Sequence, residues 1–193
     1  TVNLQLIVGL EAFNSAAHFM TTNSVIMIIE PLLGLGFIIH ILYSAYITLK
    51  NQRLRPVKYS RVNRSVSTTW PSRNMFILGG LVLIFLVIHL SNFFWKVKFG
   101  HIDTVMVNGT EMENLYALVS ELFVNYWWYD VLYILGAIFL GLHLSHGFWA
   151  AFQSLGWDND LWRKRLKVIA YLFAVVMTAG FATIPLYFLL TFS

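Results

Sequence analysis

Residues 37–46 read FIIHILYSAY, so His40 lies in an apolar run that contains no charged side chain. The run belongs to an apolar segment at about residues 25–49, longer than the roughly 20 residues that a helix needs to cross a bilayer. Three further segments of this kind follow, and each is long enough to span: about 74–95, 130–153 and 168–190. Because an ionisable side chain at membrane depth is costly, His40 indicates a functional site.

The composition predicts an all-α membrane protein. Hydrophobic residues make up 58% of the 193 positions and charged residues only 11%, whereas a soluble domain carries about 25% charged residues. Cysteine is absent, which excludes disulfides and thiolate metal ligands in this chain. Residues 1–10 are too short to cross a bilayer, and we expect them to end a helix that begins upstream of Thr1. Leucine and valine at helical spacing predict a helix on the outer surface at about 111–125.

The charges predict the orientation of the spans. Eleven of the thirteen basic residues lie in the connections 50–73 and 156–167 or at their ends. Cytoplasmic loops of membrane proteins carry such an excess, so both connections are expected in the cytoplasm. This topology accounts for the net charge of +4, and a nucleic-acid partner is not needed to explain it.

Three of the histidines inside the spans fall at two expected depths. Counting 1.5 Å per residue places His40 and His143 at about the same depth, roughly 15 Å from the cytoplasmic ends of their helices. His89 lies about 22 Å along a helix that runs outward. Two imidazoles at one level on different helices are typical of axial ligands to a haem iron. His146 follows His143 by one turn and is an alternative ligand, whereas His101 is expected at the surface.

Two other interpretations remain open. Each histidine could form only a hydrogen bond to a neighbouring helix. The histidines and Glu30 could instead relay protons through a transporter without haem. The chain has no internal repeat and few polar residues along the middles of its spans, which disfavours a transporter.

Four stretches resemble the cytochrome b membrane anchor of succinate:quinone oxidoreductases, respiratory complex II, in the class with one polypeptide and two haems. These stretches are EAFNSAAHFM, FIIHILYSAYI, FLVIHLSNFFW and LGLHLSHGFWAAF, and the resemblance covers nearly the whole chain. It implies a bundle of five transmembrane helices in a single haem-binding domain, residues 1–193, with the first helix truncated here. It further implies a multi-pass protein of the bacterial cytoplasmic membrane. The alternative cytochrome is the b-type subunit of another membrane dehydrogenase, such as a hydrogenase or formate dehydrogenase.

The resemblance also implies the ligands of two b-type haems. His40 and His143 would hold the inner haem, nearer the cytoplasm. His89 would hold the outer haem, with a partner upstream of Thr1. The ligand position of the family corresponds to His143 and not to His146. His146, Ser44 and Arg73 remain as candidates for contacts with the haem propionates or with the iron ligands.

The remaining implications concern partners and substrate. A cytoplasmic flavoprotein and an iron–sulfur subunit would carry FAD and the clusters and oxidise succinate. Electrons would then pass through both haems to a membrane quinone, which the resemblance implies is menaquinone. Quinol-driven fumarate reduction would use the same parts in reverse, so the chain is expected to act in an enzyme without dehydrogenating succinate itself. Quinone reduction needs protons, and the candidates for that site are Glu30, Glu11 and His18.

Overall fold

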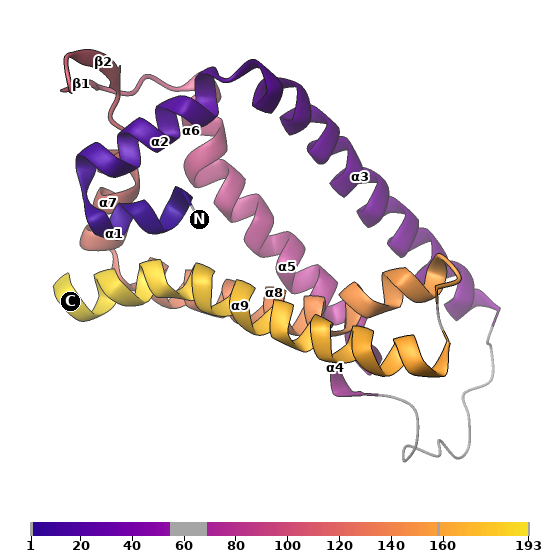
Figure 1. Cartoon of the computed structure of the whole chain (residues 1–193). Coiled ribbons are helices and arrows are strands. Elements are labelled where there is room, and N and C mark those ends of the chain that lie inside the picture. The colour runs from indigo at the N-terminus through magenta and orange to yellow at the C-terminus, as the bar shows by residue number, and fades with distance from the viewer. Residues whose placement is uncertain (1, 55–68, 158, 193) are drawn as a thin grey trace. The chain divides into compact units, whose positions relative to one another are not determined.

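The computed structural model describes residues 2–54, 69–157 and 159–192 (Figure 1). The chain divides into two compact units, which are described separately. Residues 1–17 and 69–193 form the larger unit, and residues 18–68 form the smaller one. We refer to them as the main unit and the α3 unit.

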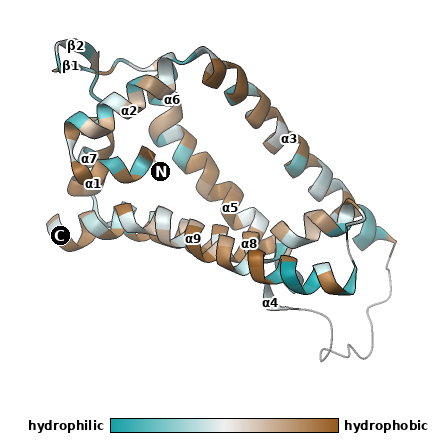
Figure 2. Ribbon diagram, in the orientation of Figure 1, coloured by the Kyte–Doolittle hydropathy of each residue, from teal (hydrophilic) through white to brown (hydrophobic). Residues whose placement is uncertain are grey.

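The described residues contain four helices that are long and apolar enough to cross a membrane. They are α3 (Ser24–Arg53), the continuous helix Met75–Phe99, α8 (Trp127–Ser154) and α9 (Asp160–Phe192). The second of these consists of α5 (Met75–His89), a π-helical segment (Leu90–Phe94) and α6 (Trp95–Phe99). Apolar residues dominate the middles of these helices (Figure 2). The chain is therefore an all-α membrane protein in its architecture, as its composition predicts.

Helix α9 begins eight residues before the expected start of the last span at 168. The side chain of Asn159 accepts a hydrogen bond from the backbone N–H of Trp162 at 2.9 Å, which satisfies one of the free donors at the helix start. The residues expected in a connecting loop therefore lie in the first turns of α9, and they include Arg163, Lys164, Arg165 and Lys167. Four expected cytoplasmic basic residues lie outside the described residues: Arg55, Lys58, Arg61 and Arg64.

In the main unit, α8 and α9 run side by side in opposite directions (Figure 1). A Cβ on Gly141 of α8 would meet the hydroxyl of Thr178 on α9, so the absence of a side chain allows this close approach. Thr178 donates to the carbonyl of Ala174 at 2.8 Å, which fixes its hydroxyl against its own helix. Nearer the α8–α9 turn, the rings of Phe148 and Phe173 pack with centroids 4.9 Å apart.

The helical residues at the start of the chain are interrupted at Gly9. A 3-10 turn (Val2–Leu4) and α1 (Gln5–Val8) precede Gly9, whose φ of 135° lies outside the helical region. Helix α2 (Leu10–Thr22) follows. The described helical residues stop at Val8, because the backbone leaves the helical conformation at Gly9. That residues 1–10 end a helix beginning upstream of Thr1 stays a prediction.

A β-hairpin and a short helix occupy the segment expected to be one surface helix at 111–125. Strands β1 (Thr104–Val107) and β2 (Thr110–Glu113) pair antiparallel, with Val107 opposite Thr110. Helix α7 begins only after the hairpin and runs from Leu115 to Asn125. The expected start at 111 is therefore wrong, because Thr110 to Glu113 are extended and paired.

A buried asparagine connects α2 to α7. Asn14 is completely buried, and its amide donates to Oδ1 of Asn114 at 3.1 Å. Its own Oδ1 accepts from the backbone N–H of Tyr116 at 2.8 Å, while Asn114 caps α7 by accepting from the N–H of Ala117 at 3.2 Å. Around this network lies the hydrophobic core of the α7 end, formed by Leu6, Phe13, Ala17, Leu115, Phe123, Tyr133, Ile184 and Phe188.

Helix α3 makes up most of the α3 unit. Asn23 caps its start by accepting from the N–H groups of Val25 and Ile26 at 3.0 and 3.3 Å. Pro31 lies inside this helix, as Pro185 lies inside α9, and neither proline ends its helix. Helix α4 (Trp70–Arg73) belongs to the main unit and precedes α5.

Candidate functional site

Helices α5 and α8 pack antiparallel in one consistent register. A Cβ on Gly79 would lie 3.6 Å from Cε1 of His143, and a Cβ on Gly136 would overlap the ring of Phe85. One turn further along α5, the ring of His89 lies 6.0 Å from that of Tyr133. Residue numbers fall along α8 as they rise along α5, so these contacts form a ladder between the two helices.

The ladder places His89 and His143 at different levels of the main unit. The backbone of α5 at Gly79 lies beside the ring of His143. Gly79 precedes His89 by ten residues on the same helix. Ten helical residues correspond to about 15 Å along the axis. The two imidazoles therefore belong to two separate sites rather than to one pair.

His89 lies among three aromatic rings. Their centroids are 5.4 Å (Phe93), 6.0 Å (Tyr133) and 6.1 Å (Phe85) from the centroid of the imidazole. Its Nδ1 is buried and has no hydrogen-bond partner among the described residues. These rings restrict the orientation of the imidazole and exclude water from one side of it.

A π-helical segment begins directly after His89. Such segments are rare and often lie at functional sites, because the extra residue changes the direction of the side chains beyond it. Asn92, within this segment, donates from its amide to the hydroxyl of Tyr133 at 3.3 Å. This hydrogen bond joins the irregular part of the α5 helix to α8 beside His89.

His143 and His146 lie on neighbouring turns of α8 but have different neighbours. Gly79 leaves the backbone of α5 open beside the ring of His143. The ring of His146 packs edge-on against Trp149 at 5.1 Å, and the ammonium of Lys167 lies 4.8 Å above the same tryptophan ring. His146 thus faces an aromatic ring and a cation, while His143 faces a backbone without a side chain.

The α3 unit carries the other half of the expected inner pair. His40 lies in α3, with Ser44 one turn further along the same face. Glu30 directly precedes Pro31 in this helix, and His18 lies in α2 at the border of the unit. Because the two units are described separately, the pairing of His40 with His143 stays a prediction.

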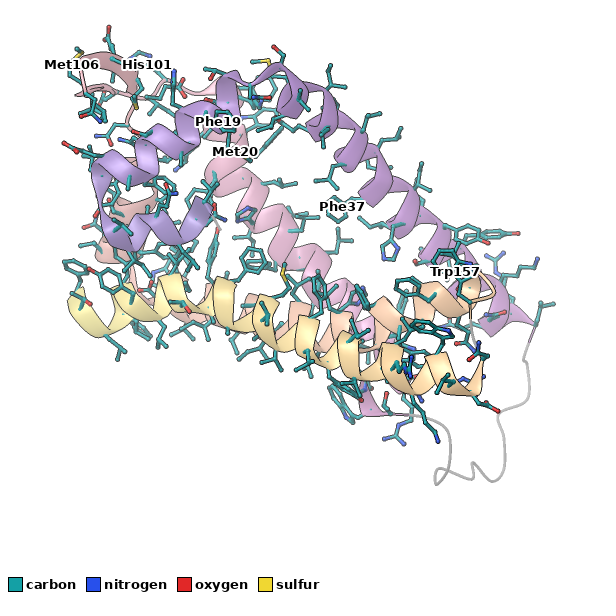
Figure 3. The ribbon with its side chains drawn as sticks, viewed as in Figure 1. Phe19, Met20, Phe37, His101, Met106 and Trp157 are labelled. Atoms are coloured by element: carbon teal, nitrogen blue, oxygen red, sulfur yellow. The ribbon has the colours of Figure 1, made fainter. Side chains whose placement is uncertain are left out.

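Three other residues singled out in the sequence are exposed. Glu11 is exposed in the first turn of α2, and Arg73 is exposed at the end of α4. His101 is exposed just before β1, in agreement with its expected place at the surface (Figure 3). The structure gives Glu11 and Arg73 no contact that assigns them to the site.

Asp130 is a residue whose burial the sequence does not reveal. Its side chain is completely buried in the first turn of α8. Neither carboxyl oxygen has a hydrogen-bond partner among the described residues. The only signal in the sequence is an acid at the start of a long apolar run, which also suits an exposed helix start.

The imidazoles of the ladder are donors of the type that haem iron accepts. Neutral imidazoles are common iron ligands, and the second ring nitrogen of a ligand usually donates to a nearby acceptor. The Nδ1 atoms of His89 and His146 are both buried without a hydrogen-bond partner among the described residues, so this feature does not by itself mark a ligand. The imidazole of His143 lies directly against the backbone of α5 at Gly79. Comparisons with protein-family models, curated proteins and solved structures found no match to this chain.

Proposed function

We propose that this chain is the di-haem cytochrome b anchor of a succinate:quinone oxidoreductase. The observation that carries the proposal is the ladder of α5 and α8, which separates His89 from His143 by about 15 Å along the membrane-spanning helices. Two imidazoles at two levels suit two haems placed in series. A single metal site would need its ligands at one level.

Each proposed haem site would use one of these histidines together with an imidazole from another helix. His143 would pair with His40, and His89 would pair with a histidine upstream of Thr1. From the observed helix ends, His40 lies thirteen residues before Arg53 and His143 eleven residues before Ser154, about 20 and 17 Å respectively. His146 lies only about 12 Å from the same end of α8, which favours His143 as the partner.

A haem with two imidazole ligands accepts and releases one electron and has no open position for oxygen. The chain would supply the environment of each iron. Phe85, Phe93 and Tyr133 would hold the imidazole of His89 in one orientation and keep water away from it. Gly79 would let the imidazole of His143 lie close to the backbone of α5.

Substrate chemistry would come from partner subunits and from the quinone. The chain has no cysteine for an iron–sulfur cluster, so a flavoprotein and an iron–sulfur subunit would oxidise succinate on the cytoplasmic side. Quinone reduction consumes two protons with two electrons, and Glu30, Glu11 and His18 are the proposed suppliers. A membrane quinone, menaquinone in this class, would accept the electrons near the outer haem.

The test is an absorbance spectrum of the full-length protein purified with its partner subunits. We expect reduced-minus-oxidised bands of two b-type haems per chain, and reduction of both by succinate. The His143→Ala variant should lose one haem, while His146→Ala and the surface control His101→Ala should keep both. Absence of haem from the wild-type protein would refute the proposal, and loss of haem in His146→Ala alone would refute the ligand assignment. Reduction by hydrogen or formate instead of succinate would assign the chain to another dehydrogenase.

A further inference from the structure

A cavity of about 580 Å³ lies at the turn between α8 and α9 in the main unit. Its volume falls in the range of about 300–1,000 Å³ that is usual for ligand sites. Aromatic and aliphatic side chains form most of its wall, and Trp157 marks its position at the turn (Figure 3). The lining residues are Phe152, Gly156, Trp157, Asn159, Trp162 and Leu166.

The lengths of α8 and α9 place this cavity at the surface of the membrane. The helices have 28 and 33 residues, whereas about 20 are enough to cross the hydrocarbon core. The turn that joins them therefore projects into the headgroup region. Trp149, Trp157 and Trp162 gather at this end, where tryptophan is enriched in membrane proteins.

A cation lies directly against the aromatic wall of the cavity, and further cations follow in the first turns of α9. The guanidinium of Arg165 lies 5.5 Å above the ring of Trp162, which is itself a lining residue. Lys167 follows the lining residue Leu166 and lies above Trp149. Arg163 forms an ion pair with Asp160 at 3.7 Å, so that acid is already engaged by a neighbouring cation. The first turns of α9 thus combine an apolar cavity with a positive rim.

We propose that this cavity binds an anionic phospholipid, with an acyl chain against Phe152, Trp157 and Leu166 and the phosphate beside Arg165. An apolar wall suits hydrocarbon, and basic pockets between transmembrane helices bind anionic headgroups. A soluble phosphate would leave the apolar wall uncovered. A protein partner would need a broad surface, whereas the lining here is a cavity between two helices that face the bilayer.

The positive charge of Arg165 at the rim sets the expected change in lipid affinity. A basic side chain near a membrane surface contributes about 1 kcal/mol to the binding of anionic lipid, which corresponds to roughly a fivefold change in affinity. Removing the charge of Arg165 should therefore weaken binding about fivefold. Shortening Trp162 should weaken binding of anionic and zwitterionic lipids alike, because it removes part of the apolar wall.

The experiment measures lipid binding to the purified full-length protein by native mass spectrometry. Short-chain phosphatidylglycerol, short-chain phosphatidylcholine and inorganic phosphate are the three probes. The variants are Arg165→Gln and Trp162→Leu. Lys50→Gln is the matched control, since Lys50 lies 5.8 Å above the ring of Tyr46 at the end of α3, away from this cavity in the sequence.

We expect phosphatidylglycerol to bind the wild-type protein more tightly than phosphatidylcholine, and this preference to fall about fivefold in Arg165→Gln but not in Lys50→Gln. Equal binding of both lipids, or an unchanged preference in Arg165→Gln, would overturn the proposal. Equal competition by inorganic phosphate would assign the rim to free anions. Protection of residues 152–157 and 159–166 from hydrogen exchange by the iron–sulfur subunit, and not by lipid, would assign the surface to a protein. None of these outcomes depends on whether the chain binds haem.

Discussion

Replacing Gly136 with alanine tests the ladder between α5 and α8 at its tightest contact. The new Cβ would lie within 2.6 Å of Cγ and Cε2 of Phe85, and it would also overlap Cδ2. Because Cγ is the root of the ring, rotation of the ring about its own axis cannot relieve the overlap. Phe85 would have to move as a whole, toward the rings of Tyr133 and His89 at 5.1 and 6.1 Å.

The expected change in the free energy of unfolding of Gly136→Ala follows from two opposing effects. Inserting a methyl group into a packed interior costs about 1–3 kcal/mol. Alanine in a helix is favoured over glycine by about 0.5–1 kcal/mol, which offsets part of that cost. Gly147 on the same helix is the matched control, since a Cβ there meets nothing within 4 Å. Gly147→Ala keeps the gain in helix propensity without the steric overlap. The free energies of unfolding of the two variants should therefore differ by about 1–3 kcal/mol.

The assay is thermal unfolding of each purified variant in the same detergent, followed by circular dichroism. Gly136→Ala should unfold at a lower temperature than the wild type or close to it, and Gly147→Ala at a higher one. If the protein carries haem, the spectrum of the haem on His89 should change in Gly136→Ala alone. A Gly136→Ala protein as stable as Gly147→Ala would refute the packing described for Phe85.

Two further predictions concern hydrogen bonds. Asn14→Ala should leave the backbone N–H of Tyr116 without its acceptor and remove one of the two donors to Oδ1 of Asn114, which costs about 1–3 kcal/mol and should speed hydrogen exchange at the start of α7; unchanged exchange there would contradict the network. Tyr133→Phe should lose the hydrogen bond from Asn92 and about 0.5–1.5 kcal/mol of stability in thermal unfolding, whereas Tyr187→Phe, which has no such bond among the described contacts, should not. Equal melting temperatures for the two tyrosine variants would contradict the contact.

The four long helices could be predicted from the sequence, but their ends could not. A run of apolar residues sets which segment enters the bilayer, whereas backbone hydrogen bonds set where the helix stops. In α9 those bonds continue through Arg163, Lys164 and Arg165, because charged side chains with long aliphatic stems form helices well. The cap at Asn159 is a visible signal, and apolar patterning alone overlooks it.

The hairpin of β1 and β2 was predictable from a signal that the helical spacing of later leucines obscured. Asn108 and Gly109 have positive φ angles of 50° and 81°, and this dipeptide is the strongest short-range indication of a hairpin turn. The surroundings of His89 could not be predicted in the same way. The register of α5 against α8 determines that Tyr133 meets His89, and that register depends on the positions of Gly79 and Gly136 in three dimensions.

The π-helical segment after His89 has a consequence for tolerance to changes in chain length. Each residue of a regular helix advances the side chains by about 100°, so a deletion ordinarily turns everything beyond it away from its neighbours. Leu90–Phe94 already holds one residue more than an α-helical turn accommodates. Shortening the chain by one residue there would convert the wide turn into a regular one and leave the contacts before it intact. The same shortening between Gly136 and His143 would rotate the contact of His143 by about 100° relative to those of Gly136 and Tyr133, so the two helices could no longer make both sets of contacts.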